Sequence, residues 1–211
     1  MRTVKDAKER RDEILDAADE LFSQKGFDKT STNEILEKIG IARGTLYYHF
    51  KSKEDIMDAL IKRYEKVLFE NAEKIAKDKS IPVYERIVKV VKALNISEQG
   101  NGQIIDHMHK PQNALMHQKT QATIIKRLTP LLTGIIEEGI EKGLFQTPFP
   151  YECMEMAIIY ASTIFDSDMI VLSNEQRKER MQAFIYNIGR MLMIEEEGAS
   201  YLKQIFERKE V

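Results

Sequence analysis

Apolar side chains recur three and four positions apart along most of this 211-residue chain, which is the spacing of one face of an α-helix. Nowhere do apolar and polar residues alternate over a stretch long enough for a half-buried strand, and the sequence contains no internal repeat. The first apolar stripe lies between Arg10 and Lys25 and stops at Gly26. The sequence therefore predicts an all-α fold.

Capping residues and helix breakers divide the chain into separate helices. Ser52 and Asp55, for instance, form a capping-box pattern at the start of a long helix that no Gly or Pro interrupts. Pro130 and Gly134 predict a kink or a break in a later helix, and the acidic run 195–197 is interpreted as solvated surface. The predicted helices cover residues 10–25, 32–39, 43–50, 53–77, 80–94, 111–143, 151–172 and 174–192.

Two of these helices are short and lie close together near the N-terminus. Ser31 and Glu34 form a capping box before the first, and Gly40 ends it. Ile41 and Ala42 then lead directly into the second helix. A short helix, a three-residue turn with Gly and a second short helix form the helix-turn-helix arrangement, which places its second helix in the major groove of DNA.

The second short helix has one anchoring face and one outward face. Leu46 and Phe50 form an i, i+4 apolar pair that anchors it to a core. Hydroxyl, imidazole and guanidinium groups on the outward face are suited to phosphates and base edges. An aromatic cluster at helical spacing is more often ordinary core, but the capped helix and tight turn before it favour nucleic acid. The outward and flanking residues are Arg43, Gly44, Thr45, Tyr47, Tyr48, His49, Lys51 and Lys53.

Residues from about Arg10 to Met57 resemble the N-terminal DNA-binding domain of the TetR/AcrR family of bacterial transcriptional regulators. One departure is Ala42, because family members often carry Ser or another capping residue there. The motifs that carry the resemblance are Ala17-Ala18, Leu21-Phe22, Gly26-Phe27, Thr30-Ser31 and the run from Gly44 to Lys53.

The resemblance implies a division into two domains and a set of DNA-binding residues. Residues 1–52 are expected to form the three-helix DNA-binding domain, and residues 53–211 a larger helical bundle that binds an effector and dimerises. The implied DNA-binding residues are Thr30, Ser31, Thr32, Arg43, Gly44, Thr45, Tyr47, Tyr48, His49, Lys51 and Lys53.

The last two predicted helices carry more apolar surface than contact with one neighbour requires. Either these faces complete the core of a single chain, or they form a four-helix dimer interface, as the resemblance implies. Two-fold symmetry would match operator half-sites that lie about 34–36 Å apart. The implied interface residues are Met154, Ala157, Ile158, Ala161, Ile164, Phe165, Met181, Phe184, Ile185, Ile188, Gly189 and Leu192.

The function that follows is an expectation built on the resemblance. A homodimer binds a pseudo-palindromic DNA operator, mainly as a repressor, and a small-molecule effector releases it by shifting the long helix that begins near Lys53. Control by a protein partner is an alternative. Another is a helical protein that binds a ligand or metal through the segment from His107 to His117.

That segment contains three of the four histidines. His107 and His109 would lie about 200° apart on a helix, which disfavours a shared metal ion, so no metal or cofactor is expected. The sequence also lacks the G-x-S-x-G, H-E-x-x-H and C-x-x-C motifs of common enzymes, and an enzyme is not expected. The residues expected to line an effector pocket are His107, Met108, Asn113, Met116 and His117.

The net charge of −2 is unusual for a protein that binds nucleic acid. Between Lys29 and Lys53, however, five cations face two acids, so the local charge is +3. The acids of the first helix must then point away from DNA, and operator affinity should depend strongly on salt. One cysteine and the lack of a signal peptide or membrane-spanning run predict a soluble cytoplasmic protein.

Overall fold

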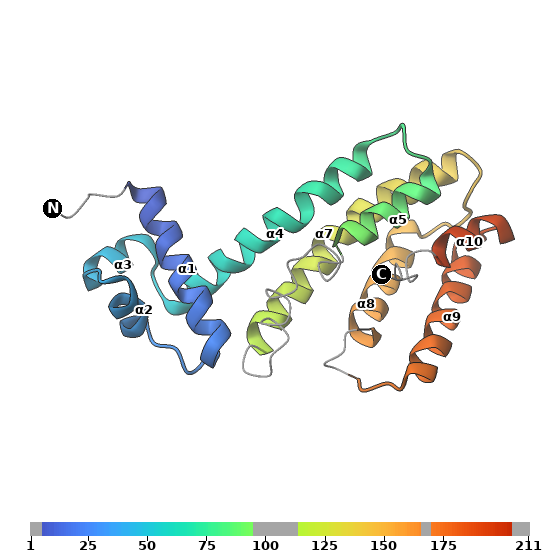
Figure 1. Ribbon diagram of the computed structural model, residues 1–211. Helices are drawn as coiled ribbons and strands as arrows, with labels where there is room; N and C mark the ends of the chain where they lie inside the picture. Colours follow the sequence, from blue (N-terminus) through green and yellow to red (C-terminus); the bar gives the residue numbers. More distant parts are fainter. Residues whose placement is uncertain (1–5, 95–113, 166–169, 204–211) are drawn as a thin grey trace, which may run out of the picture. The chain divides into compact units, whose positions relative to one another are not determined.

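The computed structural model describes residues 6–94, 114–165 and 170–203, and these ranges contain helices and no strand (Figure 1). The all-α prediction is therefore confirmed. No described helix is long and apolar enough to cross a membrane. The helices are α1 (Ala7–Lys25), α2 (Thr32–Ile39), α3 (Arg43–His49), α4 (Lys53–Lys77), α5 (Val83–Leu94), α7 (Ala114–Glu141), α8 (Pro150–Ile164), α9 (Asn174–Met191) and α10 (Glu196–Lys203).

The chain forms two compact units. The smaller unit contains the residues up to Val67 and the segment that ends at Thr120, and the larger unit contains the stretches that begin at Leu68 and at Gln121. The helices α4 and α7 each contribute residues to both units. The functional division predicted after residue 52 stays a prediction, because compactness does not define where DNA binding ends.

The smaller unit is built on the apolar faces that the sequence pattern marks. Ile14 and Ala18 of α1 are fully buried, and Leu46 and Phe50 are 0% and 1% exposed. They belong to one core cluster with α4, in which Leu60 is also fully buried. The predicted anchoring role of Leu46 and Phe50 is therefore confirmed.

The ends of the short helices follow from their capping residues. The Ser31 hydroxyl accepts a hydrogen bond from the Glu34 N–H, and the Glu34 carboxylate accepts one from the Ser31 N–H, which closes the predicted capping box. Gly40 ends α2 with φ of 66°, a left-handed conformation that favours glycine. Ala42 precedes α3 without a side-chain cap, because a methyl group cannot accept a hydrogen bond.

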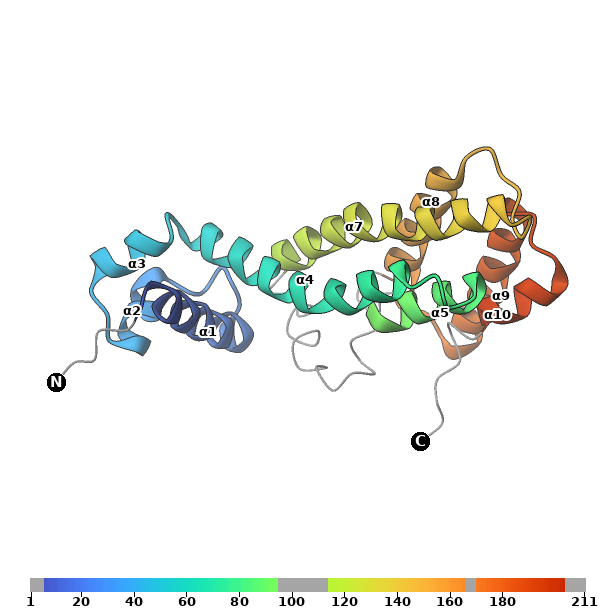
Figure 2. The same cartoon turned by 90° about the horizontal axis from the view of Figure 1, so that it is seen from above.

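The core of the larger unit joins the end of α4 with α5, α7, α8 and α9, and includes Phe69, Val90 and Ile135. Figure 2 shows α7 as a continuous helix. The sequence predicts a kink or a break near Pro130, and the break does not occur. Pro130 and Lys126 are both exposed, so solvent can hydrate the carbonyl that the missing Pro130 N–H leaves free.

At the C-terminal end one predicted helix is too long and another helix is missed. The helix predicted over 151–172 stops at Ile164, and residues 170–172 are not helical. The charge run near residue 195 leads into α10, which was not predicted. The helix α10 packs on α5 and α9, and an ideal Cβ on Gly198 would lie 2.3 Å from the Tyr84 hydroxyl oxygen. Tertiary packing that the local pattern does not encode thus places this helix.

Candidate nucleic-acid interface

The outward face of α3 is open and chemically varied. Tyr48 is 79% exposed, Arg43 and Gly44 are exposed, and Thr45 is half-buried. An ideal Cβ on Gly44 would meet no heavy atom within 4 Å, so a ligand can approach the backbone closely there. The face combines hydroxyl, aromatic and guanidinium groups on a helix that its opposite side holds firmly.

Tyr47 connects the beginnings of α2 and α3. The nearby side chains of Arg43 and Thr32 lower the pKa of the Tyr47 hydroxyl group. The Arg43 guanidinium carbon also lies 5.6 Å from the centre of the Tyr47 ring. Thr32 and Tyr47 therefore help to fix the angle between the two helices while part of the Tyr47 ring stays exposed.

Tyr48 and His49 form a second aromatic pair at the end of α3. Their ring centres lie 5.0 Å apart and the rings are nearly perpendicular. His49 is half-buried, whereas Tyr48 projects from the surface. The pair limits the freedom of the Tyr48 side chain while most of that side chain stays exposed.

Thr30 and Ser31 have structural partners instead of open surfaces. The Thr30 side chain is 1% exposed, and its hydroxyl donates to the carbonyl of Gly26 at 2.8 Å. A buried and bonded hydroxyl argues against the predicted DNA contact of Thr30, which stays untested. Ser31 is exposed, although its hydroxyl is used in the cap with Glu34.

Lys53 also points into the fold. Its Nζ atom donates to the carbonyl oxygens of Phe27 at 2.7 Å and of Thr30 at 2.9 Å. The same atom lies 4.2 Å from the centre of the Phe27 ring. Lys53 therefore holds the connection between α1 and α2, and these bonds argue against the predicted phosphate contact, which stays untested.

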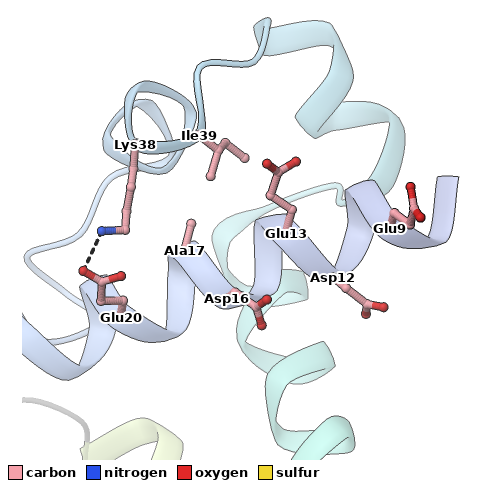
Figure 3. Close-up of a pocket in the computed structure, with 8 residues that line it drawn as sticks. All are labelled: Glu9, Asp12, Glu13, Asp16, Ala17, Glu20, Lys38 and Ile39. Carbon is pink, nitrogen blue, oxygen red and sulfur yellow. Dashed lines mark hydrogen bonds and ion pairs between the residues drawn. The ribbon is translucent and has the colours of Figure 1, made fainter. Parts of the chain in front are cut away.

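Acidic residues of α1 line a hollow together with Lys38 and Ile39 of α2 (Figure 3). The Lys38 ammonium bonds the Glu20 carboxylate at 2.6 Å and lowers the pKa of Glu20. Lys25 pairs with Glu34 in the same unit. These pairs remove Lys25 and Lys38 from the cations that are free for phosphate, whereas Lys51 is exposed.

Arg11 is a basic residue that the sequence reasoning missed. Its guanidinium carbon lies 4.7 Å from the centre of the Phe50 ring, at the end of α3. The spacing to Leu15, four residues later on the buried stripe, could have placed Arg11 on the core-facing side of α1. Its partner on α3 could not have been found that way.

Two family models match the chain. The model described as bacterial regulatory proteins of the tetR family matches residues 14–60, and the model described as a tetracyclin repressor-like C-terminal domain matches residues 95–186. The chain belongs to the TetR family. It is thus a DNA-binding transcriptional regulator, and the exposed helix α3 is the second helix of its helix-turn-helix.

Similar proteins include regulators and solved structures of this fold. The fatty acid metabolism regulator protein of Bacillus subtilis is 29% identical over 132 residues, which are 62% of this chain and 68% of the relative. The transcriptional repressor KstR2 of Mycolicibacterium smegmatis is 25% identical over 139 residues, 65% of this chain and 68% of the relative.

Two solved structures share the fold of this TetR-family chain. FadR from Bacillus subtilis in complex with stearoyl-CoA has 24% identity and a TM-score of 0.52, and the match covers 79% of this chain and 95% of FadR. A gamma-butyrolactone receptor, an ArpA-like protein, has 14% identity and a TM-score of 0.58, with 95% of both chains covered. These likenesses concern the fold alone.

The predicted effector residues of this TetR-family chain are only partly described. His107, Met108 and Asn113 lie outside the described residues. Met116 is 4% exposed in the core of the smaller unit, and His117 is half-buried. The described ranges contain no group of three or more His, Cys, Asp or Glu side chains that could hold a metal ion. The pocket assignment stays a prediction.

The predicted interface residues separate into two groups. Met154, Ile158, Ile188 and Leu192 are buried in the core of the single chain and expose little surface to a partner. The remaining residues are half-buried, namely Ala157, Ala161, Ile164, Phe165, Met181, Phe184, Ile185 and Gly189. The interface stays a prediction. The burial of the four core residues favours the alternative in which these helices complete the core of a single chain.

Proposed function

We propose that this regulator is a repressor whose homodimer binds a pseudo-palindromic operator through two α3 helices in successive major grooves. The observation that carries the proposal is the outward face of α3, where Tyr48 is 79% exposed beside the open backbone of Gly44. Leu46, fully buried on the opposite side, fixes this face to the core. Such a helix presents hydrogen-bonding groups to base edges while its backbone approaches the groove closely.

Dimerisation is proposed through the outer faces of α8 and α9, which pack against each other in the larger unit. Met156 is 60% exposed, Ile159 is 44% exposed and Tyr186 is 67% exposed. Tyr160 stacks on Phe184 at 5.5 Å between ring centres, which gives the patch a rigid aromatic part. Exposed apolar side chains gathered on two adjacent helices support an interface between copies.

The proposed effector is an apolar or amphipathic small molecule that binds the larger unit. The Bacillus subtilis relative of this fold was solved with stearoyl-CoA, so a long-chain acyl-CoA is the first probe. An effector releases DNA only if it binds the free conformation more tightly than the operator-bound one. We also propose that the protein is cytoplasmic and has no catalytic activity.

Selection of bound duplexes from a random DNA pool tests the proposal. We expect an enriched pseudo-palindrome with half-sites about 34–36 Å apart. Stearoyl-CoA should lower the affinity for that operator, whereas coenzyme A alone, the matched control, should not. Selection that enriches no sequence would refute the proposed operator binding, and equal effects of the two compounds would exclude a long-chain acyl group as the signal.

A further inference from the structure

Arg11 brings a cation from α1 to the end of the recognition helix. Its guanidinium carbon lies 4.7 Å from the centre of the Phe50 ring, and Phe50 is the residue that caps α3. The Phe50 side chain is 1% exposed, whereas Arg11 is exposed. A guanidinium over a fixed ring is held in place, and its N–H groups remain able to bond an outside anion.

Arg11 differs from its neighbours in having no carboxylate partner among the described residues. Arg10, next to it, bonds Glu13. Arg63 bonds Asp16 at 2.6 Å. The positive charge of Arg11 is therefore available to an outside anion, whereas these two guanidinium groups already have carboxylate partners.

Most acids of α1 lie away from Arg11 around the helix axis. At about 100° per residue, Glu9, Asp16 and Glu20 are between about 140° and 180° away from Arg11, whereas Asp12 and Asp19 are about 100° and 80° away. Figure 3 shows the carboxylate of Glu20 bonded to Lys38 of α2. A polyanion at the Arg11 side thus lies away from most of the α1 carboxylates.

We propose that Arg11 is a DNA phosphate contact and that it works with Lys51, the exposed residue that follows Phe50. The two cations flank the end of α3, where Arg11 offers a planar pair of donors and Lys51 a point charge. The inference rests on the proposed operator binding. It adds a contact from α1 to a surface otherwise made of α2 and α3.

Covering the Phe50 ring is the alternative role of Arg11, and the salt dependence of operator binding separates the two roles. Arg11→Met keeps an unbranched stem over the ring and removes the charge, whereas Arg11→Lys keeps the charge. Arg10→Met is the matched control. It removes the same charge at the neighbouring position, where Arg10 is already paired with Glu13. Arg11→Gln serves as a second neutral variant if Arg11→Met does not fold.

Operator affinity is measured for the full-length dimer by fluorescence anisotropy between 50 and 200 mM salt. Log affinity falls as log salt rises, and each lost phosphate contact makes this fall less steep by about 0.9. The loss in the dimer is therefore about 1.8. The affinity deficit of Arg11→Met should thus be about tenfold larger at 50 mM than at 200 mM salt. Arg11→Lys and Arg10→Met should retain the wild-type slope.

A wild-type slope in both neutral variants would overturn the inference while leaving operator binding intact. An equal loss of slope in Arg10→Met would also overturn it, since net charge alone would then explain the effect. Wild-type protein that binds no duplex in a salt-dependent way would overturn the inference together with the proposed operator binding. Dimer mass and the thermal unfolding midpoint identify the folded variants.

Discussion

Arg86 and Glu138 are joined by two parallel hydrogen bonds, from Nη1 to Oε2 and from Nη2 to Oε1, each 2.8 Å long. The Arg86 side chain is 2% exposed and that of Glu138 is 13% exposed. Nη1 also donates to the carbonyl of Ala76 at 3.4 Å, so one guanidinium connects α5 with α7 and with the end of α4. This contact lies inside the larger unit.

Removing the carboxylate of this pair should destabilise the larger unit strongly. Glu138→Ala leaves the Arg86 charge buried without its partner, which costs about 3–5 kcal/mol of unfolding free energy. Glu85→Ala is the matched control, because its ion pair with Lys89 is exposed and worth at most about 1 kcal/mol. Urea unfolding followed by circular dichroism measures both, and equal losses would contradict the account.

The same pair predicts a loss of stability in acid. Arg86, and secondarily Lys142, lowers the pKa of Glu138 from 4.5 to about 2. Because the folded pKa is the lower one, the ionised form favours folding, and this contribution is complete above pH 4.5 and declines as the pH falls toward 2. The difference in unfolding free energy between wild type and Glu138→Gln should therefore shrink below pH 4.5. A difference that stays constant down to pH 3 would contradict this.

Two glycines of α7 should respond to alanine in opposite directions. An ideal Cβ on Gly139 would lie 2.2 and 2.3 Å from two ring carbons of Phe145, which is buried. Gly139→Ala should thus cost about 1–3 kcal/mol. Gly134 is exposed with no atom within 4 Å of its ideal Cβ, so Gly134→Ala should add about 0.5–1 kcal/mol. Unfolding curves that move in the same direction would refute the packing argument.

These positions show how far the sequence determines the structure. Leu46 and Phe50 follow from helical spacing, because burial of a helix face repeats locally. The direction in which the Lys53 side chain points does not follow from the spacing, since the carbonyl of Phe27 that it bonds is 26 positions away. The crowding at Gly139 depends on where Phe145 returns after a turn. Local periodicity thus predicts the helices and the outward face of α3, whereas contacts distant in sequence decide which polar groups remain free.

Lys53→Met should weaken the smaller unit without changing the salt dependence of DNA binding. The variant loses two charged hydrogen bonds to backbone carbonyls, which we expect to cost about 1–3 kcal/mol at this half-buried site. Lys51→Met is the control, since its exposed ammonium should affect the salt slope by about 0.9 per subunit and leave stability unchanged. A reduced slope in Lys53→Met at unchanged thermal stability would show that Lys53 contacts phosphate instead.

The central claim is that the outward face of α3 binds the operator, and Tyr48→Ala tests it most directly. Tyr48 is 79% exposed and outside the core, so the variant should fold and dimerise normally. Tyr151→Ala, which removes an exposed tyrosine from α8, is the matched control. Anisotropy with the selected operator should show a loss of about ten- to a hundredfold in affinity for Tyr48→Ala and none for Tyr151→Ala. Wild-type affinity in a dimeric Tyr48→Ala protein would contradict the account.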